Sequence, residues 1–71
     1  MSELAGKSLT AREQQVSEYL CLGWSNKEIA QVLHLSPRTV EDHRNTIFEK
    51  MVVRNVVELV RKIYRIGETA S

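Results

Sequence analysis

The chain has 71 residues, of which 42% are hydrophobic and 27% are charged, and its formal net charge is +1. This balance is typical of one soluble folded domain, because it is too apolar for a disordered chain and contains no run of about 18 apolar residues that could span a membrane. A chain below about 80 residues has a small core and no room for a substantial catalytic cavity. We therefore expect neither an enzyme nor a cofactor.

The cysteine and histidine content argues against a disulfide framework or a metal site. Cys21 is the single cysteine, and it shows no metal-ligand spacing with His34 or His43. We interpret Cys21 as a small, partly buried helix residue. Residues 1–11 also lack the apolar segment of a signal peptide, so the sequence predicts a cytoplasmic protein.

Signals for helix starts predict four helices and an all-α fold. Three starts have the three-residue spacing of a capping box, at Thr10 with Glu13, Ser25 with Glu28 and Asn55 with Glu58. The fourth start is Ser36, a capping residue followed by a proline at the first helical position. We predict helices over residues 11–22, 26–33, 37–50 and 56–66, with stops at Gly23, His34-Leu35 and Gly67 and flexible ends at 1–8 and 68–71.

Apolar side chains recur at helical spacing in each segment, which predicts a single shared core. The expected members are Leu9, Val16, Leu20, Trp24, Ile29, Ala30, Val32, Leu33, Val40, Ile47, Met51, Val56, Leu59, Val60 and Ile63. The small Ala30 allows the second and third helices to cross closely, and the connection between them is only about three residues long. Residues 25–40 therefore read as a helix-turn-helix.

Four motifs in order resemble the LuxR-type helix-turn-helix family, which includes FixJ-, NarL- and GerE-like domains. The motifs are Leu9-Thr-Ala-Arg-Glu13, Gly23-Trp-Ser-Asn-Lys-Glu-Ile-Ala30, Leu35-Ser-Pro-Arg-Thr-Val-Glu-Asp-His-Arg44 and Val53-Arg-Asn-Val-Val-Glu-Leu-Val60. The resemblance covers residues 9–66 and predicts a domain over 9–67. It implies a nucleoid-associated bacterial transcription regulator whose third helix enters the major groove of double-stranded DNA and whose fourth helix forms a homodimer. Regulation of transcription would make RNA polymerase a further partner.

Two positions depart from the family pattern, which commonly has glycine at both. Val52 follows the third helix, and a β-branched residue resists the left-handed conformation of a glycine cap. We therefore expect Val52 to stay in the β region and the third helix to end without a Schellman motif. His34, in the turn after the second helix, tolerates positive φ better.

The third helix has an outward face opposite its apolar stripe. This face carries Arg38, Glu41, Asp42, Asn45 and Glu49. The family places its base contacts at the positions of Glu41, Asp42 and Asn45. Asn45 can pair with adenine, and either acid can accept a hydrogen bond from cytosine N4. Alternatively, the two acids are solvated charges that limit non-specific binding.

Phosphate contacts are expected where helix starts expose amide donors. The candidates that assist them are Ser25, Asn26, Lys27, Ser36, Arg38 and Thr39. Arg44 and Arg54 are further candidates, although each could instead pair internally with Glu13.

The fourth helix has a second apolar face beside its core stripe. It carries Val57, Val60, Arg61 and Tyr64. Two such helices across a two-fold axis would form a homodimer, weak without DNA, on an inverted repeat. The alternative function is a protein-interaction module that uses the same scaffold without DNA. Both a complete small regulator and the output domain of a larger protein fit this length.

Overall fold

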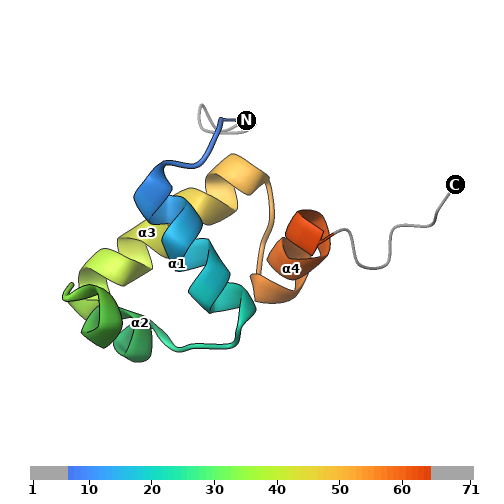
Figure 1. The fold of residues 1–71 in the computed structure, drawn as a ribbon. Coiled ribbons are helices and arrows are strands. Elements are labelled where there is room, and N and C mark those ends of the chain that lie inside the picture. The colour runs from blue at the N-terminus through green and yellow to red at the C-terminus, as the bar shows by residue number, and fades with distance from the viewer. Residues whose placement is uncertain (1–6, 65–71) are drawn as a thin grey trace, which may run out of the picture.

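The computed structural model describes residues 7–64, which form four helices (Figure 1). They are α1 (Ala11–Cys21), α2 (Asn26–Leu33), α3 (Pro37–Met51) and α4 (Val56–Tyr64). This part of the chain contains no strand, and the all-α prediction is confirmed. Helix α1 ends one residue earlier than predicted and α3 one residue later. The predicted stop at Gly67 and the tail over 68–71 lie outside the described residues, as do parts of the predicted arm and of the fourth helix.

The predicted capping residues begin all four helices. Thr10 and Ser25 each form a reciprocal capping box, in which the side chain of the residue three positions later accepts from the cap amide. The Ser36 hydroxyl accepts from the Thr39 amide at 3.1 Å. Asn55 caps α4 through its side-chain oxygen. The α4 cap differs from a capping box because the Glu58 carboxylate accepts from the Arg54 amide, at 2.7 Å, and not from Asn55.

Three helices end in the same way, with one residue in the left-handed conformation. That residue is Gly23 after α1, His34 after α2 and Val52 after α3. In each case the next amide donates back across the last turn, as in a Schellman motif. These bonds run from Trp24 to the Tyr19 carbonyl, from Leu35 to Ala30 and from Val53 to Phe48, at 3.1, 2.9 and 3.0 Å.

The expectation for Val52 is therefore wrong. Val52 has φ 57° and ψ 50°, which is fully left-handed. Steric strain at a non-glycine residue in this region costs about 1–2 kcal/mol. The turn offsets that cost by providing the Val53 to Phe48 bond and by bringing Val53 against the core, where it is partly buried. The third helix thus ends with a Schellman motif without glycine.

One core lies where α1, α2, α3 and α4 meet. Its buried members are Val16, Leu20, Ile29, Ala30, Val40, Ile47 and Leu59. Two predicted core residues are largely outside it, since Val32 is 44% exposed and Ile63 is 37% exposed. Val32 is three residues after Ile29 and lies at the edge of the apolar stripe of α2. Ile63 is next to the last residue of α4 and lines an open groove beside α1.

Two predictions for the end of α1 and its connection to α2 are confirmed. Trp24 packs at the α1–α2 connection, with its ring 4.7 Å from that of Tyr19, centroid to centroid. Cys21 is half-buried, and burial, with a smaller contribution from nearby Glu18, raises the pKa of its thiol. Between residues 7 and 64, no helix has the length and apolar character needed to cross a membrane.

Candidate nucleic-acid interface

The outward face of α3 is open to solvent along the length of the helix. All five of its polar residues, Arg38, Glu41, Asp42, Asn45 and Glu49, are exposed. The opposite face holds Val40 and Ile47, which are completely buried. Because α3 packs against α1, α2 and α4 on the side that carries Val40 and Ile47, its outward polar face is left as a convex surface that a groove of a partner could accept.

This face contains one ion pair between adjacent turns. Arg38 Nε lies 3.4 Å from Asp42 Oδ1, and the two side chains remain 81% and 65% exposed. The structure therefore joins a residue predicted to contact phosphate with a residue predicted to read a base. Helical spacing predicts that both residues lie on the same face, but it does not predict that they contact each other.

Helix α2 lies beside the first part of α3 (Figure 1), and the starts of both helices provide backbone donors. The first amides of a helix have no intrahelical acceptor. At α2 the Ser25 side chain accepts from the Glu28 amide, so the amides of Asn26 and Lys27 remain as donors. At α3, Pro37 has no N–H and Ser36 accepts from Thr39, which leaves the amide of Arg38.

The side chains at these helix starts are also accessible. Ser25, Lys27, Ser36 and Arg38 are exposed, and Asn26 and Thr39 are half-buried. The hydroxyl groups of Ser36 and Thr39 lie 2.9 Å apart, so they are oriented by each other. An anion placed before α2 or α3 would meet amide donors and the positive end of a helix dipole.

Arg44 and Arg54 do not pair with Glu13. Arg44 lies over Phe48, with Cζ 5.1 Å from the ring centroid, and its buried Nε has no hydrogen-bond partner among the described residues. Arg54 is exposed and lies near Glu58, with an Nε to Oε2 distance of 3.9 Å. Neither arginine therefore has Glu13 as an internal partner.

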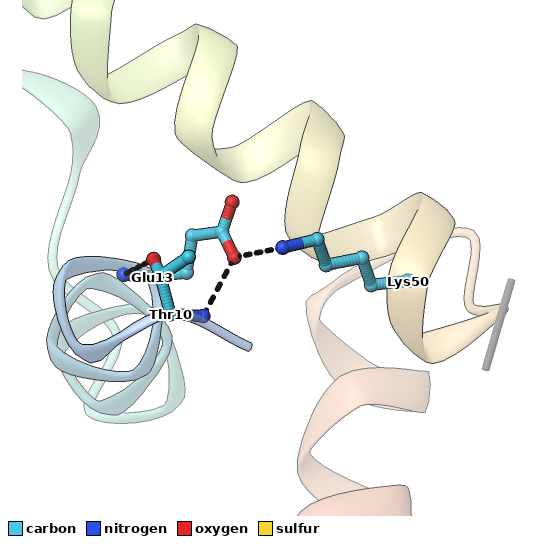
Figure 2. Close-up of polar contacts among 3 residues, drawn as sticks. All are labelled: Thr10, Glu13 and Lys50. Atoms are coloured by element: carbon cyan, nitrogen blue, oxygen red, sulfur yellow. Dashed lines mark hydrogen bonds and ion pairs between the residues drawn. The ribbon is translucent and has the colours of Figure 1, made fainter. Parts of the chain in front are cut away.

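Lys50 is the partner of Glu13, and sequence reasoning missed it. The two residues join the last turn of α3 to the first turn of α1, and the Thr10 amide donates to the same carboxylate (Figure 2). The sequence did contain one indication that Glu13 is buried. Glu13 precedes Val16 and Leu20 by three and seven residues, so it lies on the apolar side of α1. A carboxylate in that position needs a cation, although its spacing does not identify Lys50.

The second apolar face of α4 is exposed as predicted. Val57 is 61% exposed and Tyr64 is 55% exposed, with exposed Arg61 and half-buried Val60 beside them. Tyr64 and Ile63 also line an open groove of about 360 Å³ whose other side is formed by α1 and Met51. Among the described residues, no group of three histidine, cysteine, aspartate or glutamate side chains could hold a metal ion.

These features define a helix-turn-helix domain in which the polar face of α3 is open to solvent. The family model described as bacterial regulatory proteins, luxR family, matches residues 7–63. The chain therefore belongs to the LuxR family of bacterial regulatory proteins. No solved structure matched the chain.

Several regulatory proteins are similar to this chain. The transcriptional regulatory protein UhpA of Escherichia coli K12 is 52% identical over 56 residues, which cover 79% of this chain and 29% of UhpA. FixJ of Bradyrhizobium diazoefficiens is 47% identical over 60 residues, which cover 84% of this chain and 29% of FixJ. The uncharacterized response regulatory protein YgeK of E. coli is 42% identical over 59 residues, which cover 83% of this chain and 40% of YgeK. The chain thus spans less than half the length of these relatives.

Proposed function

We propose that this domain binds double-stranded DNA in a sequence-specific manner and thereby regulates bacterial transcription. The observation that carries the proposal is the two-sided character of α3, with Val40 and Ile47 fully buried and the residues of the opposite polar face exposed. A helix of this kind fits the major groove, which is about 12 Å wide. Membership of the LuxR family supports the same function.

In this proposal, Glu41, Asp42 and Asn45 face the bases, and the starts of α2 and α3 bind phosphates. The open amides of Asn26, Lys27 and Arg38 provide uncharged donors that position the domain on the backbone. Ser25, Ser36 and Thr39 add hydroxyl groups, and Arg44 and Arg54 add positive charge because neither is neutralised by Glu13. We propose that a protein with such contacts acts at the bacterial nucleoid, in the cytoplasm, with RNA polymerase as a downstream partner.

We propose further that residues 9–67 act as one unit that dimerises through Val57, Val60, Arg61 and Tyr64 of α4. The exposure of Val57 and Tyr64 supports this dimer, because these side chains are free to contact a second copy of α4. In such a dimer, the two copies of α3 would be related by a two-fold axis and would lie about one turn of DNA apart. The patch is smaller than a standard stable interface. We therefore expect the free domain to be mainly monomeric and to dimerise on an inverted repeat.

The test compares two variants on DNA that the purified domain selects from a random pool. Asn45→Ala should weaken binding to the selected site by about 1–3 kcal/mol and relax the preference at one base pair. Lys27→Ala should weaken binding to all sequences equally and reduce the salt slope by about one. If both variants have the same effect on selected and random DNA, Asn45 does not read a base.

The second candidate is a protein-interaction module that uses the outward face of α3. The acidic side chains Glu41 and Asp42 on that face favour it. The two functions differ in their dependence on salt, because a DNA-binding domain releases counterions and loses affinity steeply as log salt rises. Failure of the domain to select any DNA would support the second candidate.

A further inference from the structure

We propose that Arg38 reads a guanine in the major groove and that Asp42 positions it. This inference rests on the proposed DNA binding and assigns different roles to both residues within it: Arg38 contacts a base in place of a phosphate, and Asp42 holds Arg38 in place of accepting from cytosine.

The position of Arg38 on the helix is the first support. Arg38 and Asn45 are seven residues apart, which is close to two full turns, so their side chains leave α3 in nearly the same direction. Arg38 is the second residue of α3, and the N-terminal residues of a recognition helix are those that contact base edges. Its side chain is 81% exposed. It can therefore reach the same groove as Asn45.

The geometry of the ion pair is the second support. Asp42 Oδ1 contacts Arg38 through Nε, at 3.4 Å, and so leaves the two terminal nitrogens of the guanidinium group as a fork. Guanine presents two acceptors, O6 and N7, on its major-groove edge, and an arginine fork binds both. No other base presents two acceptors there, so this arrangement is selective for guanine.

Charge provides the third support. An unpaired carboxylate on α3 is repelled by phosphates, whereas the Arg38–Asp42 pair is neutral as a unit. The pair has little value for folding, because exposed pairs of this spacing contribute little to stability and a cation in the first turn opposes the helix dipole. Helix stability therefore does not account for Arg38 at this position.

The experiment measures binding of the selected site and of its single base-pair variants. The proteins are the wild type, Arg38→Ala, Arg38→Lys and Asp42→Asn, together with the double variant Arg38→Ala/Asp42→Asn. Arg38→Ala and Arg38→Lys should each lose about 10-fold or more of the discrimination at one G·C pair, since lysine lacks the fork. Asp42→Asn should lose part of the discrimination at the same pair, and the double variant should resemble Arg38→Ala. Thermal unfolding should be nearly unchanged in all four variants.

Two outcomes would overturn the inference while the proposed function stands. If Asp42→Asn loses discrimination at a different base pair from Arg38→Ala, Asp42 reads a base of its own. If Arg38→Ala weakens binding to all sequences equally and lowers the salt slope by about one, Arg38 contacts phosphate. A wild-type domain that shows no sequence preference would overturn both the inference and the proposed function.

Discussion

Lys50 Nζ lies 2.5 Å from Glu13 Oε1 and connects the last turn of α3 to the first turn of α1. Both side chains are nearly buried, at 11% and 9% exposure, and the Thr10 amide donates to the same oxygen at 2.9 Å. The carboxylate thus completes a helix cap and fixes the position of α3 at once (Figure 2). A buried pair of this kind stabilises little relative to apolar residues, but loss of one partner leaves an uncompensated charge.

The two single replacements in this pair should therefore lower the free energy of unfolding by more, when summed, than the double replacement does. Glu13→Gln and Lys50→Met should each lower the free energy of unfolding by about 1–3 kcal/mol, because each leaves a buried charged group without its partner. The double variant should lose much less than the sum of the two. Urea unfolding of the four proteins measures this coupling. Strict additivity would show that the contact does not contribute to stability.

The stability of the domain should fall in acid partly through Glu13. Burial alone raises the pKa of this carboxyl group, but hydrogen bonds from Lys50 and the Thr10 amide outweigh burial and hold the pKa below its ordinary value of 4.5. The unfolded chain then binds this proton more readily than the folded domain. The contribution of Glu13 is complete above pH 4.5 and is lost as the pH falls through the lower folded value.

Glu13→Gln should accordingly flatten the dependence of stability on pH in this acidic range. Part of the dependence should remain, because the hydrogen bond from the Ser25 amide also lowers the pKa of Glu28. Thermal unfolding between about pH 3 and 7, which spans the ordinary pKa values of carboxyl groups, measures the pH dependence of stability in the wild type and in Glu13→Gln. An equal slope in the wild type and in Glu13→Gln would contradict the role of the ion pair.

Replacing Val52 by glycine should stabilise the domain. Val52 is left-handed and 63% exposed, so glycine relieves backbone strain and removes little packing. The greater freedom of glycine in the unfolded chain offsets part of the gain. We expect a net gain of about 1 kcal/mol, seen as a rise of about 4–8 °C in Tm.

His34→Gly is the matched control, because His34 has the same left-handed conformation at the end of α2. Its gain should be smaller than that of Val52→Gly, since histidine is less strained in this region than a β-branched residue. A lower Tm for Val52→Gly than for the wild type would show that the side chain of Val52 contributes more than the strain costs.

Val57→Glu should abolish cooperative binding to an inverted repeat and leave binding to a single half-site intact. When two copies of α4 pack across a two-fold axis, the glutamates introduced at position 57 of both copies would enter a small apolar contact. Burying these charges there is costly. Titration of DNA with one or two half-sites measures both properties.

Val57→Lys separates this effect from repulsion by DNA. A lysine is attracted to phosphate, but it disrupts an apolar interface as glutamate does. Both variants should therefore lose cooperativity. If only Val57→Glu loses it, the effect is electrostatic, and if neither does, α4 is not the dimer interface.

The sequence by itself determined the features that depend on neighbouring residues. Capping is an interaction over three residues, so Thr10, Ser25 and Ser36 identified their helix starts directly. Helical periodicity likewise predicted that Val40 and Ile47 are buried while Asn45 is exposed, because position on a regular helix follows from spacing alone.

The tertiary structure decided the features that depend on distant contacts. Lys50 pairs with Glu13 across 37 residues of chain, and no local spacing selects that lysine from the other cations. Val52 adopts a left-handed conformation against its own preference, because the chain must reverse there for Val53 to reach the core. Ile63 follows the core periodicity of α4 but stays 37% exposed, since burial requires a neighbouring element and not only the correct phase of a helix.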